Sequence, residues 1–274
     1  MAHEDQPVTR YLSRPHGRVA YEVGGTGPLV VLVPGMGELR ASYRFLAPVL
    51  RAHGYRVAAT DLRGHGDSDV TFSAYGDAET AGDVIALIEL LGAPAIVVGN
   101  SMGAAAAVLA AAMRPTMIDG LILIGPFVRD PKRGALRRLT QRIAMTPLWA
   151  GAAWRVYTPR LYAGTLPADF DAYRQLVADA LRRPGYARSL SHTARASHDA
   201  AEASLAMVSV PSMVIMGDLD PDFPDPAGEA TWIADRLHAT VVMVPDAGHY
   251  PQSQRPELVT AAVLNFLIED DRNA

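Results

Sequence analysis

The chain has 274 residues, of which 49% are apolar, and a formal net charge of −4. This size and balance predict a soluble globular protein with a sizeable core. The mild acidic charge gives none of the basic footprint expected of a nucleic-acid partner. The chain contains no cysteine, which excludes disulfides, thiolate catalysis and cysteine metal sites.

The first residues lack the basic and apolar regions of a secretory signal. No apolar run reaches the length of a membrane span. We therefore expect a cytoplasmic protein with no membrane span. The sequence does not indicate what the oligomeric state is.

Strand and helix patterns alternate through the first part of the chain. Short apolar or alternating runs predict strands at 18–23, 29–33, 56–59, 95–99 and 120–125. Apolar residues at helical spacing predict helices at 43–52, 81–91 and 104–112. The glycines between residues 24 and 28 lack the spacing of a phosphate loop and indicate a hairpin turn.

The alternation stops after residue 126 and resumes near residue 206. The part between has helical patterns only, at 133–145, 169–181 and 197–205. Strands are expected again at 212–216 and 240–244, and helices at 228–237 and 257–268. This order predicts one α/β domain with a doubly wound, mostly parallel sheet, formed by residues 1–126 and 206–274. Residues 127–205 form a helical insertion.

The segment Gly99-Asn100-Ser101-Met102-Gly103 joins a buried strand to an alanine-rich helix. Gly-x-Ser-x-Gly in this context predicts a sharp turn that exposes the serine hydroxyl at the top of the sheet. The turn also places Ser101 at a helix N-terminus, where free backbone N–H groups stabilise negative charge. Ser101 is therefore the candidate nucleophile.

A serine nucleophile needs a base, and the base needs an acid to orient it. His249 follows the last apolar strand, in a loop at the same edge of the sheet as Ser101. The loop after the preceding strand offers Asp218, Asp220 and Asp222, and we favour Asp220 with Asp222 in reserve. The order Ser, Asp, His then holds along the chain.

The tetrahedral intermediate of such a reaction needs two N–H donors for its oxyanion. One is expected from the backbone of Met102, the residue after the nucleophile. The other is expected from the loop Pro34-Gly35-Met36-Gly37, with Met36 as the donor. Nothing in the sequence calls for a metal or an organic cofactor.

The segment 61–68, the nucleophile segment, Asp220 and His249 occur together in this order along the chain. As a set they resemble the α/β-hydrolase superfamily over nearly the whole chain except the insertion. The resemblance implies a structural role for 61–68 (Asp-Leu-Arg-Gly-His-Gly-Asp-Ser) and makes the insertion a cap that forms the acyl or leaving-group pocket. It implies a carboxylesterase-type serine hydrolase with a Ser-His-Asp triad, acting on a small-to-medium ester.

Two departures from the family pattern bear on the reaction. The usual His-Gly before the oxyanion residue is Pro34-Gly35 here. The elbow sequence is also common in hydrolases that cleave carbon–carbon bonds in ring-fission products, but those have a longer glycine-rich oxyanion loop. We therefore rank ester hydrolysis above carbon–carbon cleavage, cofactor-free perhydrolysis and ligand binding with slow turnover. Ser101 argues against dehalogenases and epoxide hydrolases, which place Asp at this position.

Two features of the insertion have no assigned role. Several aromatic residues could shape an apolar pocket or hold the helices together, and these are Trp149, Trp154, Tyr157, Tyr162 and Phe170. A basic run fits a solvated face or the recruitment of an acidic partner, and it comprises Arg129, Lys132, Arg133, Arg137, Arg138 and Arg142.

Overall fold

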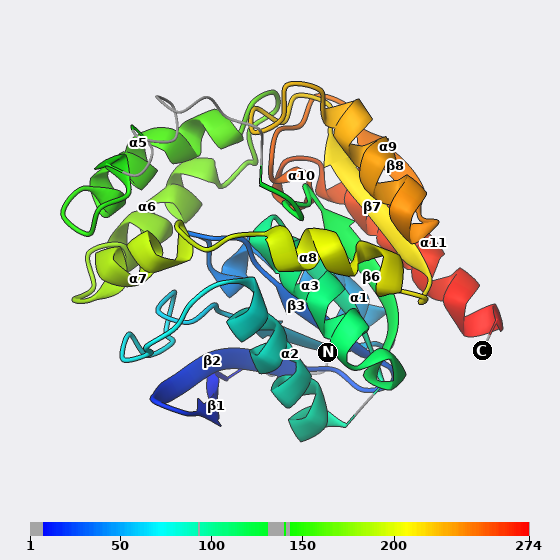
Figure 1. Cartoon of the computed structure of the whole chain (residues 1–274). Helices are drawn as coiled ribbons and strands as arrows, with labels where there is room; N and C mark the ends of the chain where they lie inside the picture. Colours follow the sequence, from blue (N-terminus) through cyan, green and yellow to red (C-terminus); the bar gives the residue numbers. More distant parts are fainter. Residues whose placement is uncertain (1–7, 93, 131–139, 141–142, 274) are drawn as a thin grey trace, which may run out of the picture.

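The computed structural model describes residues 8–92, 94–130, 140 and 143–273. Eight strands form one sheet in the order β1-β2-β4-β3-β5-β6-β7-β8 (Figure 1). The pairs β1–β2 and β2–β4 are antiparallel, and all later neighbours are parallel. The strand bounds are β1 Arg10–Arg14, β2 Gly17–Gly24, β3 Leu29–Val33, β4 Arg56–Thr60, β5 Ala95–Asn100, β6 Ile118–Ile124, β7 Ser212–Gly217 and β8 Thr240–Val244.

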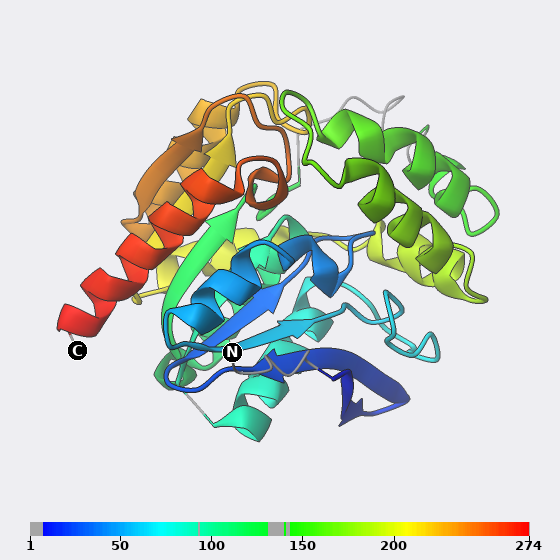
Figure 2. The ribbon, with the colours of Figure 1, turned by 180° about the vertical axis from the view of Figure 1, so that it is seen from behind.

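Helices cover both faces of the sheet, so the central strands β3 and β5 are buried along their whole length (Figures 1 and 2). One face is covered by α2 (Asp77–Leu91), α3 (Met102–Met113), α8 (Asp199–Ser204) and α9 (Pro226–Leu237). The other face is covered by α1 (Leu46–Ala52) and α11 (Pro256–Asn273). The predicted doubly wound, mostly parallel sheet is confirmed.

The alanines of α3 explain its central place. Ala104, Ala105, Ala106 and Ala107 are all fully buried. Their small side chains let α3 lie close to β5 and to α2 at the same time, while alanine keeps a high helix propensity. The parallel strands end at one edge of the sheet, which brings together the loops that follow β5, β6, β7 and β8.

The predicted hairpin at residues 24–28 is wrong. The strand β2 pairs with β4, and β4 in turn pairs with β3, so β2 and β3 are not neighbours. The turn carries the chain past the end of β4, where Arg56 N–H donates to the Pro28 carbonyl at 2.9 Å. The strand β1 lies in the polar lead-in, where no strand was expected, because an edge strand needs only one buried side chain, Leu12.

The insertion after β6 contains α5 (Ala150–Leu161), α6 (Phe170–Ala180) and α7 (Tyr186–Thr193), which form a separate layer beside the sheet (Figure 1). These helices have their own apolar cluster, to which Leu39 and Tyr250 of the sheet loops also belong. In contrast, α8 packs on α3, with Ala201 in the main core. The helix predicted over 133–145 lies largely outside the described residues. No helix in the described ranges is both long and apolar enough to cross a bilayer.

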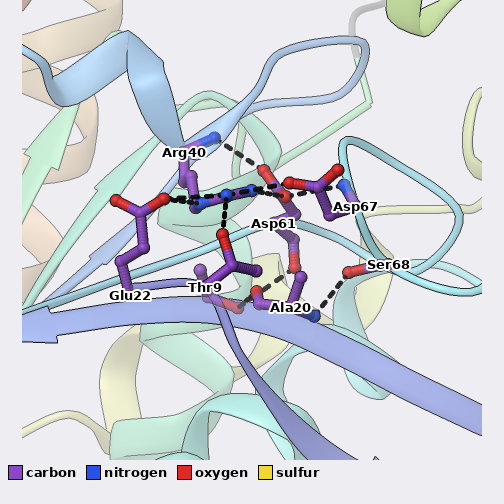
Figure 3. Close-up of polar contacts among 8 residues, drawn as sticks. Thr9, Ala20, Glu22, Arg40, Asp61, Asp67 and Ser68 are labelled. Carbon is purple, nitrogen blue, oxygen red and sulfur yellow. Dashed lines mark hydrogen bonds and ion pairs between the residues drawn. The ribbon is translucent and has the colours of Figure 1, made fainter. Parts of the chain in front are cut away.

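The segment 61–68 anchors an ion-pair network on the antiparallel side of the sheet. Figure 3 shows the carboxylates of Glu22, Asp61 and Asp67 converging on the Arg40 guanidinium. Asp61 also accepts a hydrogen bond from the Arg40 backbone N–H at 2.8 Å, and Ser68 Oγ accepts one from Ala20 N–H at 2.9 Å. Burial raises the pKa of the Asp61 carboxyl, and the Arg40 charge opposes this shift.

Replacing Arg40 with methionine is expected to lower the free energy of unfolding by about 3–5 kcal/mol, because it leaves a buried carboxylate without its counter-charge. The Arg40 side chain is 12% exposed and that of Asp61 is fully buried. Guanidinium unfolding at neutral pH would measure the change. Arg18→Gln is the matched control, since Arg18 pairs with Asp69 at the surface and its loss should not move the midpoint. Equal midpoints for both variants would contradict the expectation.

Candidate active site

Ser101 lies in a strained turn between β5 and α3. Its backbone has φ 55° and ψ −121°, a conformation that non-glycine residues rarely adopt. The turn is held on both sides of the serine. Ser101 N–H donates to the Ile124 carbonyl at 2.9 Å, and the Ser101 carbonyl accepts from Phe127 N–H at 3.2 Å. These bonds to the end of β6 and the residues after it hold the strained backbone, and the Ser101 residue is half-buried.

The two glycines of the elbow are required by close backbone contacts. A Cβ on Gly99 would lie 2.3 Å from the carbonyl oxygen of Gly103, and one on Gly103 would lie 2.4 Å from that of Val33. No side chain tolerates such distances. The first turn of α3 is therefore pressed against β3 and β5, and this contact fixes Ser101 in place.

His249 and Asp220 are hydrogen-bonded at the end of β7 and β8. The His249 Nδ1 atom lies 2.7 Å from Asp220 Oδ2, and both side chains are almost fully buried. The other carboxylate oxygen of Asp220 accepts from Asp222 N–H at 3.0 Å, which orients the acid. Asn100 Nδ2 donates to the carbonyls of Ile124 and His249, so the residue before the nucleophile holds the histidine loop.

The other two acids of this loop have different contacts. Asp218 Oδ1 accepts a hydrogen bond from Ala247 N–H at 3.4 Å, a turn-stabilising role. Asp222 Oδ2 lies 3.9 Å from Nε2, the ring nitrogen of His249 on the side away from Asp220. Tyr157 of α5 donates a hydrogen bond to Asp222 Oδ1. Asp220 is thus the acid that hydrogen-bonds Nδ1, and Asp222 links the cap to the other side of the ring.

The loop with the expected oxyanion donor lies against Ser101. A Cβ on Gly35 would lie 2.8 Å from the Ser101 Cβ. Among the described residues, the Met36 N–H has no hydrogen-bond acceptor. The N–H of Met102 belongs to the first turn of α3, which has no acceptor within the helix. Among the described residues, both N–H groups are thus left without an acceptor, in the two segments where oxyanion donors are expected.

The Ser101 hydroxyl makes no hydrogen bond to His249 or to any other described residue. Catalytic hydrogen bonds of this kind are commonly long in the free enzyme and tighten when substrate binds.

Charge around the ring sets the protonation of His249. Burial opposes the charged ring, but the carboxylates of Asp220, Asp222 and Glu38 outweigh it and raise the pKa of His249 to about 9. Two of these acids are Asp220, the expected partner of His249, and Asp222, the alternative candidate. The third, Glu38, was not anticipated.

Glu38 follows the oxyanion loop and is completely buried. Burial raises the pKa of its carboxyl to about 7, against the opposing effects of Tyr173 and Arg44. Tyr173 of α6 donates a hydrogen bond to Glu38 Oε2. No pattern in the sequence distinguishes Glu38 from an exposed loop glutamate, because its partner Tyr173 is 135 residues away.

The cap contacts both catalytic loops. The Trp154 indole N–H donates to the Gly37 carbonyl at 3.3 Å, in the oxyanion loop. His249 N–H donates to the Leu161 carbonyl at 2.7 Å, and Gln254 Nε2 donates to the carbonyls of Ala163 and Thr165. The end of α5 and the chain that follows it are therefore bonded to the segment that carries His249.

The aromatic residues of the insertion divide between two uses. Trp154, Tyr162 and Phe170 pack in the cap cluster, and Tyr157 reaches Asp222. Trp149 is instead exposed. Of the basic run, Arg129 pairs with Glu229 and stacks on Trp232, and the other five residues lie outside the described ranges.

Asp220, Asp222 and His249 are also the one group of described ligand-type side chains close enough to hold a metal ion, with donor atoms within 4.8 Å of one another. The Nδ1 atom of His249 is already hydrogen-bonded to Asp220. The geometry is that of an oriented acid–base pair.

Comparisons with known proteins identify the family to which the chain belongs. The chain is 26% identical over 263 residues to 2-(acetamidomethylene)succinate hydrolase of Mesorhizobium japonicum, and the match covers 92% of each chain. It is 30% identical to the dihydrolipoyllysine-residue acetyltransferase component of the acetoin cleaving system of Pseudomonas putida, covering 90% of this chain and 65% of that protein. A thermophilic esterase from Thermogutta terrifontis superposes with a TM-score of 0.77 and 25% identity, over 97% of this chain and 99% of the esterase. Residues 30–262 match the alpha/beta hydrolase family, and the chain belongs to that family.

Proposed function

We propose that this hydrolase cleaves a small-to-medium carboxylic ester through an acyl-enzyme on Ser101. One observation supports the proposal: Asn100, the residue before the strained Ser101, donates a hydrogen bond to the backbone of His249, whose ring is bonded to the buried Asp220. Ser101 Oγ attacks the ester carbonyl while His249 takes its proton, and the N–H groups of Met36 and Met102 bind the oxyanion. The intermediate expels the alcohol, which takes the proton from His249. Water activated by His249 then releases the acid.

The charges near His249 favour a neutral substrate over an anionic one. The Asp222 carboxylate lies 3.9 Å from His249 Nε2, and Glu38 adds a second negative charge near the ring once it ionises above its pKa of about 7. The guanidinium that acts on Glu38, Arg44, is itself paired with Asp169 at 2.6 Å. A dienoic keto acid or a free carboxylate would meet this negative field. An uncharged ester would not.

The cap is proposed to form the walls of the substrate pocket. Support comes from the contacts of Trp154 with the oxyanion loop and of Tyr157 with Asp222. The proposed cap starts after residue 126 and ends before α8, because α8 packs on α3 rather than on α5–α7. Its boundary is therefore earlier than the expected residue 205.

The proposal is tested by steady-state hydrolysis of a p-nitrophenyl ester series from acetate to decanoate. Cleavage of a dienoic keto acid and formation of a peracid are measured in parallel. Turnover of esters above the other two reactions, with a maximum at one acyl length, supports the proposal and sizes the pocket. Faster consumption of the keto acid would assign carbon–carbon cleavage. Tight product binding with negligible turnover of every substrate would assign a receptor.

The pH profile of kcat/KM for ester hydrolysis is expected to change when Asp222 is replaced. Because His249 must be neutral to accept the serine proton, kcat/KM is expected to rise with pH toward the His249 pKa of about 9. Asp222→Asn removes one carboxylate that raises this pKa, so the acid limb of the profile should move to lower pH. Below the limb, each pH unit of movement increases the rate about ten-fold.

Tyr157→Phe is the matched control for this variant. It breaks the hydrogen bond to Asp222 Oδ1 but keeps the carboxylate charge. Its acid limb should therefore not move to lower pH. The same profile for Asp222→Asn and wild type would contradict the assigned role of the charge.

A further inference from the structure

The start of α5 and the two residues before it expose an apolar stripe that no described residue covers. The exposed fractions are 81% for Leu148, 57% for Trp149 and 71% for Val156, and Ala152 is exposed between them. The opposite face carries the buried Trp154, which contacts the oxyanion loop. Helix α5 therefore has two apolar faces, and only one of them belongs to the protein interior.

Two arginines flank this stripe. At about 100° per residue, Arg155 and Arg160 fall on opposite sides of the line through Ala152 and Val156. Both side chains are exposed, and neither forms an ion pair with a described residue. The combination of an apolar stripe, a tryptophan and flanking arginines is typical of helices that lie in a lipid interface.

The distribution of charge along the chain also favours contact with an anionic surface. Residues 131–160 contain seven basic and no acidic residues, whereas the rest of the chain has 18 basic and 29 acidic residues. Five of the seven precede the stripe in a segment outside the described residues, and their charge is a property of the sequence. An anionic surface would attract this stretch of the chain and repel the more acidic remainder.

We propose that the α5 face, defined by Leu148, Trp149, Ala152 and Val156 with Arg155 and Arg160 beside them, docks on an anionic lipid surface. A second copy of the chain fits this face less well. A symmetric contact would place the same arginines of both copies against one another, and the described residues 143–160 contain no acid to pair with them. The bound α5 would lie in the interface with its inner face still on the catalytic loops. Docking does not depend on which ester the site cleaves.

The test is co-sedimentation of the full chain with vesicles of phosphatidylglycerol and phosphatidylcholine in equal parts, or of phosphatidylcholine alone. Binding is expected to the anionic vesicles and to weaken with added salt. Trp149→Gln with Val156→Gln should weaken it by at least about ten-fold, because two buried apolar side chains are lost. Arg155→Gln and Arg160→Gln should weaken it by about five-fold each.

Two surface variants on other faces are the controls, Met207→Gln and Arg10→Gln, which should bind as wild type. Trp149→Phe supplies a second readout that needs no polar substitution, since brominated lipid should quench tryptophan fluorescence in the wild type and not in this variant. Failure to bind anionic vesicles, equal binding to both kinds of vesicle, or wild-type binding by the stripe variants would overturn the proposal. So would light scattering that shows a dimer which the stripe variants convert to a monomer.

Discussion

Ser101→Ala is expected to abolish ester hydrolysis, with kcat lowered by a factor on the order of 10⁵–10⁶. The variant removes only the hydroxyl that forms the acyl-enzyme, and the backbone of the elbow is held by Ile124 and Phe127. A residual rate of about 10³-fold over water should remain from the oxyanion donors and substrate binding. Kinetics on the best ester of the series would measure it.

Ser204→Ala is the matched control for the loss of a serine hydroxyl. Ser204 lies at the end of α8, where its Oγ donates to the Ala200 carbonyl at 2.8 Å, so this variant should keep full activity. A fluorophosphonate should add one covalent adduct to the wild type and to Ser204→Ala, and none to Ser101→Ala. Near-normal turnover of Ser101→Ala would remove the serine mechanism altogether.

Asp220→Asn is expected to lower kcat by about 10⁴-fold, because an amide would hold His249 in the wrong tautomer. The side chain is buried and its Oδ2 lies 2.7 Å from His249 Nδ1. Asp218→Asn is the control on the same loop, since Asp218 contacts only the Ala247 backbone. If Asp218→Asn lost as much activity as Asp220→Asn, the loop conformation rather than the acid would be responsible.

The apolar patterns of the sequence located the central sheet well. The strand expected at 240–244 has those bounds in the structure, and the one expected at 29–33 does too. All five residues of β3 are buried, so each must be apolar and the pattern is unambiguous. The strand β8 lies at the edge of the sheet with Thr240 and Val241 exposed, and its run of Val and Met still predicts a strand. The edge strand β1 was not predicted, because only one of its side chains is buried and its polar sequence is typical of a loop.

The pairing of strands and the limits of the insertion could not be read from local patterns. The turn at 24–28 resembles a hairpin, but β4 lies between the strands that it joins. The helix α8 has the same local character as the cap helices and differs only in its partner, α3. Both features depend on residues far apart in sequence.

Some residues of the candidate site could likewise be predicted from the sequence, and others could not. Ser101 and His249 follow strands whose carboxyl ends must meet, so their proximity follows from the topology. The choice among Asp218, Asp220 and Asp222 depends on the loop conformation, which only the structure supplies. Glu38 and the Tyr157–Asp222 contact come from tertiary packing between the cap and the sheet, and no sequence spacing encodes them.

The bonds that join the end of α5 to the histidine loop have a consequence for exchanging caps between relatives. His249 N–H depends on the Leu161 carbonyl, and Gly164 forms an isolated bridge with Ala247. A Cβ on Gly248 would lie 2.3 Å from the same Leu161 oxygen. Residues 161–165 thus hold the loop that carries His249, the proposed general base. A chimaera that imports a foreign cap to change specificity must keep this strip from the recipient, because a graft joined inside it would displace His249 along with the old pocket.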